Sequence, residues 1–82
     1  MTAFEAKRIA DAANHQNSED IASDILNDVA RTAKEGLYSK FFSYALPINF
    51  DYEKVVHRLK YEGYRVSIKL SPSAFVLKVM WD

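Results

Sequence analysis

The segment from Phe75 to Trp81 constrains the fold more than any other part of the chain. Its alternate positions are apolar on both sides, with one lysine as the exception: Phe75, Leu77, Val79 and Trp81 on one side, and Val76, Lys78 and Met80 on the other. A strand that can be buried on both faces belongs in the middle of a sheet rather than at its edge. The sequence therefore predicts a sheet in which this strand has a neighbour on each side.

Two further segments have the patterns of those neighbours. Tyr64 to Leu70 alternates apolar and polar residues, as a half-exposed outer strand does, and the turn Ser71–Ala74 joins it to the last strand. Tyr38 to Leu46 is rich in aromatic residues, and Pro47 ends it.

A helix is predicted between these two outer strands, from about Asp51 to Glu62. Asp51 suits the N-cap, and Phe50 before it can pack against Val55 one turn later. Gly63 suits the left-handed C′ position, which would bring Tyr64 against Leu59 in a Schellman motif. The order strand, helix, strand, strand predicts an α+β fold: a split βαβ unit whose three-stranded sheet has the order 1-3-2, with this helix covering one face.

Residues 1–36 are expected to be helical. Thr2 and Glu5 have capping-box spacing, and an Ala-rich stripe follows them. The polar run Asn14–Ser18 then favours a turn before a second helix that ends at Gly36, although a polar patch within one long helix is the alternative. We expect a helical arm or hairpin that shares the covered sheet face, covers the other face, or projects outward.

Length and composition limit the class of protein. The 82 residues suit a single domain, with residues 37–82 as its β-α-β-β core, because only one of the aromatic residues, Phe4, precedes residue 38. There are no cysteines, no long apolar run and no signal-peptide layout. We therefore expect a protein of the cytoplasm or a virion that is neither secreted nor inserted in a membrane.

Charge is distributed unevenly although the formal net charge is zero. Residues 1–36 contain more acidic than basic residues and residues 37–82 the reverse, a dipole that can orient a protein partner or a second copy. Asp20, Asp24 and Asp28 stand four residues apart on a predicted helix. This stripe is either a solvated face or a surface for a partner.

The sequence offers no catalytic centre, and we expect no cofactor. His15 and His57 lack ligands at metal-binding spacing, apart from Glu53 four residues before His57, and two ligands do not make a metal site. The only glycines, Gly36 and Gly63, fall at helix ends, so no phosphate-cradling loop is expected. We therefore predict a non-enzymatic protein.

Two kinds of binding surface remain. If a helix covers one sheet face, the other carries Phe41, Val76 and Met80, which suits a protein partner or self-association into a homo-oligomer. The alternative is a nucleic-acid module that uses basic residues of the helix and strands: Lys54, Arg58, Arg65 and Lys69. A pI near 6.7 argues against this alternative, because nucleic-acid modules usually exceed about 9.

The sequence resembles a loose class of small, mostly uncharacterised proteins of tailed phages. The likeness consists of a helix that ends in L-x-x-x-G-Y-x-V, here from Leu59 to Val66, and a final strand that ends near Trp81. Some members of the class are labelled virion components. The resemblance implies a virion protein or an accessory protein that binds a host factor, and it implies no functional residue.

Overall fold

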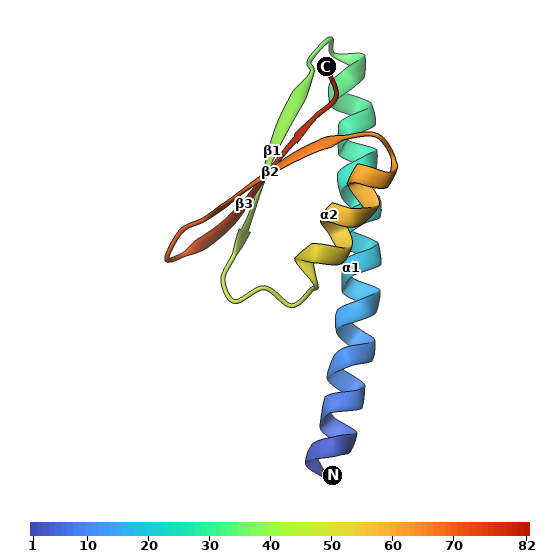
Figure 1. Cartoon of the computed structure of the whole chain (residues 1–82), viewed down its shortest axis with the longest axis vertical. Helices are drawn as coiled ribbons and strands as arrows, with labels where there is room; N and C mark the ends of the chain where they lie inside the picture. Colours follow the sequence, from blue (N-terminus) through green and yellow to red (C-terminus); the bar gives the residue numbers. More distant parts are fainter.

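The computed structural model describes all 82 residues and contains two helices and three strands. In chain order these are α1 (Ala3–Lys34), β1 (Ser39–Ala45), α2 (Tyr52–Tyr61), β2 (Arg65–Leu70) and β3 (Ala74–Met80). The strands form one antiparallel sheet in the order β1-β3-β2, and both helices lie on the same side of it (Figure 1). The predicted sheet order, with the last strand at the centre, is confirmed.

The register of the sheet divides its residues between two faces. Phe42 and Ile68 lie opposite Leu77, whereas Phe41 and Ser67 lie opposite Lys78. We call the side that meets the helices the inner face; on β3 it consists of the buried residues Phe75, Leu77 and Val79. The outer face has no helix over it, and its residues on β3 are half-buried: Ala74, Val76, Lys78 and Met80.

The prediction of two N-terminal helices is wrong, because α1 is one continuous helix of 32 residues. The polar run at 14–18 lies within this helix, and two of its side chains bind the loop that leads into α2. Asn17 Nδ2 donates to Asn49 O at 3.0 Å, and the Ser18 hydroxyl accepts from the Asp51 backbone N–H at 2.7 Å. The cap-forming residues thus make tertiary hydrogen bonds from within a helix.

The core also extends further back along the chain than the aromatic residues predict. It contains nine apolar residues, and three of them belong to α1: Ala22, Ile25 and Val29. They pack with Val55 and Leu59 of α2 against the inner face. Aliphatic residues of the second half of α1 therefore complete the core that residues 37–82 begin.

The ends of α2 are as the sequence predicts. The Asp51 side chain caps its first turn by accepting from Glu53 N at 3.0 Å. At its end Gly63 has a φ of +95°, and Tyr64 N donates to Leu59 O at 3.1 Å, which completes the Schellman motif.

Trp81, which follows β3, is hydrogen-bonded to the turn between α1 and β1. Its backbone N–H donates to Tyr38 O at 3.0 Å and its indole N–H donates to Leu37 O at 2.9 Å. Its ring meets that of Tyr64 edge to face, with 6.3 Å between centroids. The C-terminus is therefore anchored beside the turn between α1 and β1.

The first third of α1 leaves the rest of the domain. Residues 3–13, which we call the N-terminal arm, are all exposed, and they extend along the longest axis of the molecule beyond α2 and the sheet (Figure 1). The arm begins at a proper N-cap, where the Thr2 hydroxyl accepts from Glu5 N at 3.1 Å. Two of the outcomes expected for residues 1–36 thus occur together: one part shares the inner face, and the other projects.

Candidate interaction surfaces

The outer face of the sheet brings together the three apolar residues that the sequence selected there. Phe41 lies opposite Lys78 on β3, and Val76 and Met80 are its diagonal neighbours on the same face. Phe41 is 64 % exposed, and the Lys78 ammonium lies 5.2 Å from the centre of its ring. The outer face is therefore an apolar patch with a cation at its centre.

The cations of this face have no anion among the strands. Arg65, Lys69 and Lys78 all lie on the outer face, and no strand carries an acidic residue. The one carboxylate beside them is Asp82, which pairs with Arg65. The hydrogen bond from Arg65 lowers the pKa of the Asp82 carboxyl, and the charges of Arg65 and Lys78 act in the same direction. Asp82 is thus an acceptor for Arg65 and leaves Lys69 and Lys78 unpaired.

The other two residues of the predicted nucleic-acid surface lie elsewhere. Lys54 and Arg58 belong to α2, which covers the inner face, so the sheet does not bring them together with Arg65 and Lys69. They line a shallow hollow of about 150 Å³ between α1 and α2, together with His15 and Glu19. Lys54 and Arg58 therefore lie in the helix layer, whereas Arg65 and Lys69 lie on the outer face of the sheet.

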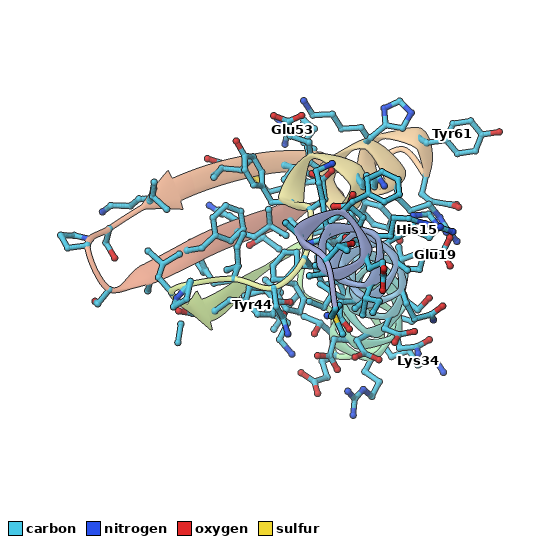
Figure 2. The ribbon with its side chains drawn as sticks, turned by 90° about the horizontal axis from the view of Figure 1, so that it is seen from below. His15, Glu19, Lys34, Tyr44, Glu53 and Tyr61 are labelled. Carbon is cyan, nitrogen blue, oxygen red and sulfur yellow. The ribbon has the colours of Figure 1, made fainter.

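The hollow contains a short chain of polar contacts. Lys54 Nζ lies 3.2 Å from His15 Nδ1, and His15 Nε2 lies 3.2 Å from Glu19 Oε1. Figure 2 shows His15 and Glu19 next to each other on α1. A histidine oriented by a carboxylate is half of a nucleophilic site, but the nearby Ser18 hydroxyl donates to Asn14 O and accepts from Asp51 N. The Ser18 hydroxyl is therefore occupied by structural hydrogen bonds and is not free to act as a nucleophile. The contacts of His15 with Lys54 and Glu19 form a surface network.

Glu53 and His57 are exposed on α2, and neither makes a hydrogen bond to the other. Figure 2 shows the Glu53 side chain directed outward from α2, with Tyr61 projecting from the helix end. No group of three His, Asp or Glu side chains stands close enough to hold a metal ion.

The acidic stripe of α1 is divided among local partners. Asp20 accepts from Gln16 Nε2 at 3.0 Å, and Asp28 pairs with Arg31. Asp24 faces β1: burial raises the pKa of the Tyr44 hydroxyl, and the negative charge of Asp24 raises it further. The three carboxylates thus interact with different residues, and the stripe does not form a single free acidic surface.

Sequence reasoning missed one apolar surface, on the inner side of the β2–β3 hairpin. Ile68 is 43 % exposed and Leu70 is 69 % exposed, although both point to the face that the helices cover. A groove of about 280 Å³ runs between α2 and β2 and is lined by Tyr52, Val56 and Ile68 among others. The lengths of the predicted elements already indicated this exposed surface. The ten residues of α2 span about 15 Å, which is shorter than the β2–β3 hairpin that the helix should cover.

No protein-family model, curated protein or solved structure matches this chain. Although α1 is long enough to cross a bilayer, neither helix contains a stretch apolar enough to do so.

Proposed function

We propose that this protein is a non-enzymatic interaction module that binds another protein through the outer face of its sheet. The observation that carries the proposal is the position of both helices on the inner face, which leaves Phe41, Val76 and Met80 without cover (Figure 1). Apolar side chains gathered on an uncovered face of a small domain are typical of an interaction site.

The charge of the face indicates the chemistry of the partner. Lys78 lies at the centre of these apolar residues and Lys69 lies opposite Val76, and no strand carries a carboxylate that could pair with either lysine. A complementary surface would present apolar side chains to Phe41 and carboxylates to the two lysines. We therefore propose an acidic protein surface as the partner. The resemblance to tailed-phage proteins extends the proposal to a virion component or a host factor as the source of that surface.

A second candidate is single-stranded nucleic acid on the same face. The specific observation in its favour is the pairing of an exposed aromatic ring, Phe41, with Lys78 at its face and Lys69 and Arg65 nearby. Bases stack on such rings, and phosphates bind such cations. The structure supports this version with Arg65, Lys69 and Lys78 and not with Lys54 or Arg58, which belong to the helix layer.

Site-specific photocrosslinking tests both candidates in the cells that produce the protein. A photoreactive phenylalanine analogue at position 41 should give one dominant crosslinked protein, and Lys78→Glu in the same chain should abolish it. The matched control is the analogue at Tyr61, an aromatic residue that is 83 % exposed and lies on α2. Equal crosslinking from both positions would contradict the proposal.

The second candidate predicts a different product. Crosslinks from position 41 would then be sensitive to nuclease, and the purified protein would bind a labelled single-stranded oligonucleotide. That binding should weaken steeply between low and moderate salt, because phosphate contacts release counterions. Binding that is indifferent to salt, or to Phe41→Ala, would exclude nucleic acid.

A further inference from the structure

The sheet has two edge strands, β1 and β2, and only β1 has a charged residue that points to the inner face. Lys40 of β1 lies opposite Val79 and therefore on the inner face, and α1 packs alongside this strand. A charge that points inward from an edge strand is a common defence against edge-to-edge pairing, and a covering helix is another. A helix packs alongside each edge strand, α1 along β1 and α2 along β2, so the inward-pointing Lys40 is the defence that only β1 has.

β2 lacks the inward-pointing charge, and its two charged residues, Arg65 and Lys69, lie on the outer face. Its inner-face residues are all apolar (Val66, Ile68 and Leu70), and the strand contains no proline or glycine. Ile68 and Leu70 are exposed because the hairpin tip extends past the helices, as the view in Figure 2 shows. The backbone groups along this edge have no partner strand, because β2 is last in the sheet order.

We infer that β2 pairs antiparallel with β2 of a second copy of this chain, so that two three-stranded sheets join into one of six strands. A twofold axis perpendicular to the sheet keeps the inner face of both copies on one side. Residues directly opposite each other must then belong to the same face. Two registers satisfy this condition and overlap most of the six-residue strand: one is centred on Ser67 and the other on Ile68.

Charge decides between the two registers. Centring on Ser67 places Arg65 of each copy opposite Lys69 of the other, and like charges directly opposite destabilise a sheet. Centring on Ile68 places Lys69 opposite Ser67, and Val66 opposite Leu70. The structure therefore assigns the register in which Ile68 faces Ile68 of the second copy.

This register also makes β2 complementary to itself. Read in either direction from Ile68, β2 presents apolar residues on the inner face at every position and Ser67 or Lys69 on the outer face. Such self-complementarity is what a twofold interface requires. Pairing brings the Ile68 side chains of the two copies together on the inner face and places Val66 beside Leu70, which reduces the exposure of Ile68 and Leu70. The inference concerns a different surface from the outer face and does not depend on the proposed function.

Cysteine crosslinking tests the register, because the natural chain has no cysteine. Residues directly opposite in an antiparallel pair have Cα atoms about 4.5–5.5 Å apart, within disulfide range, whereas diagonal neighbours are about 7–8 Å apart. Ile68→Cys should therefore form a disulfide-linked dimer under mild oxidation, and Ser67→Cys on the same strand should form at least tenfold less. The opposite preference would overturn the register.

Sedimentation of the unmodified full chain tests the pairing itself. We expect a dimer that Ile68→Asp shifts to monomer by at least tenfold in dissociation constant, whereas Ile9→Asp in the arm leaves it unchanged. An NMR fingerprint of the Ile68→Asp protein shows that it remains folded. A monomer at concentrations up to about 1 mM, where even a weak pair is half-associated, overturns the inference. So does a dimer that Phe41→Asp or Ile9→Asp dissociates and Ile68→Asp does not.

Discussion

The two parts of α1 differ in what surrounds them, although one unbroken helix contains both. Residues 14–34 place Ala22, Ile25 and Val29 in the core, whereas residues 3–13 are all exposed and contribute nothing to the core. Close to the border between these two segments, the side chains of Asn17 and Ser18 bind the loop at Asn49–Asp51. One helix therefore includes a segment with tertiary contacts and a segment without them.

The difference shows what determines the length of a helix in this fold. A helix of about a dozen residues is marginal in water when it stands alone, because starting the first turn is costly. The arm avoids that cost, since it extends a helix that the core already stabilises. Local features support it further: Thr2 caps the first turn, and Lys7 pairs with Asp11 at 3.3 Å. The packed segment is stabilised by burial, and the arm by propagation from it.

The largest expected effect comes from a matched pair of isoleucines. Ile25 is 1 % exposed and Ile9 is 59 % exposed. Ile25→Ala should lower the free energy of unfolding by about 2–5 kcal/mol, because it removes buried methylenes and leaves a cavity. Ile9→Ala should change it by less than about 0.5 kcal/mol. Urea unfolding of both variants measures the difference, and equal losses would mean that the arm packs against the domain.

A smaller effect is expected at the border between the two segments. Ser18→Ala leaves the Asp51 backbone N–H without its acceptor, which should cost about 1–3 kcal/mol in the same urea titration. The control is Gln16→Ala, which removes only an exposed contact to Asp20 one turn along the helix. Should the two variants lose the same stability, the hydrogen bond to the loop would not be what fixes the border.

The smallest effect is an alkaline change in stability that the packed segment alone should produce. Burial raises the pKa of the Tyr44 hydroxyl on β1 above its ordinary value of 10.0, and the negative charge of Asp24, in the packed segment, raises it further. The folded protein then holds the proton more tightly than the unfolded chain. The contribution of Tyr44 to stability is therefore constant below about pH 10 and is lost as the pH rises through the folded pKa.

Tyr44→Phe should remove that alkaline fall, whereas Tyr61→Phe should leave it in place because Tyr61 is exposed. Unfolding free energies between about pH 8 and 11 give the slopes of the variants. An unchanged slope in Tyr44→Phe would assign the alkaline loss to another group.

The sheet could be predicted from the sequence because its information is local. The alternation from Phe75 to Trp81 requires a central strand, and Gly63 flanked by Leu59 and Tyr64 at Schellman spacing indicates a helix stop. The outer-face set Phe41, Val76 and Met80 also follows, since strand alternation fixes which residues share a face. Each of these inferences needs only the residues of the element itself.

What could not be predicted depends on distant partners. Asn17 and Ser18 have the composition of a turn, and their partners from within the helix belong to the loop at Asn49–Asp51, more than thirty residues later. Lys54 and Lys69 could not be assigned to separate surfaces until α2 and the sheet were placed. The exposure of Leu70 likewise depends on where α2 ends relative to the hairpin.

Because of the position of Trp81, fluorescence and circular dichroism report different parts of this molecule. This residue is the only tryptophan, and its indole N–H donates to Leu37 O in the turn between α1 and β1. Its fluorescence therefore follows the core and not the arm. Far-ultraviolet ellipticity follows every helical residue, the arm included. On heating, the ellipticity should begin to fall before the fluorescence changes, and the gap between the two curves is a direct record of the arm fraying by itself.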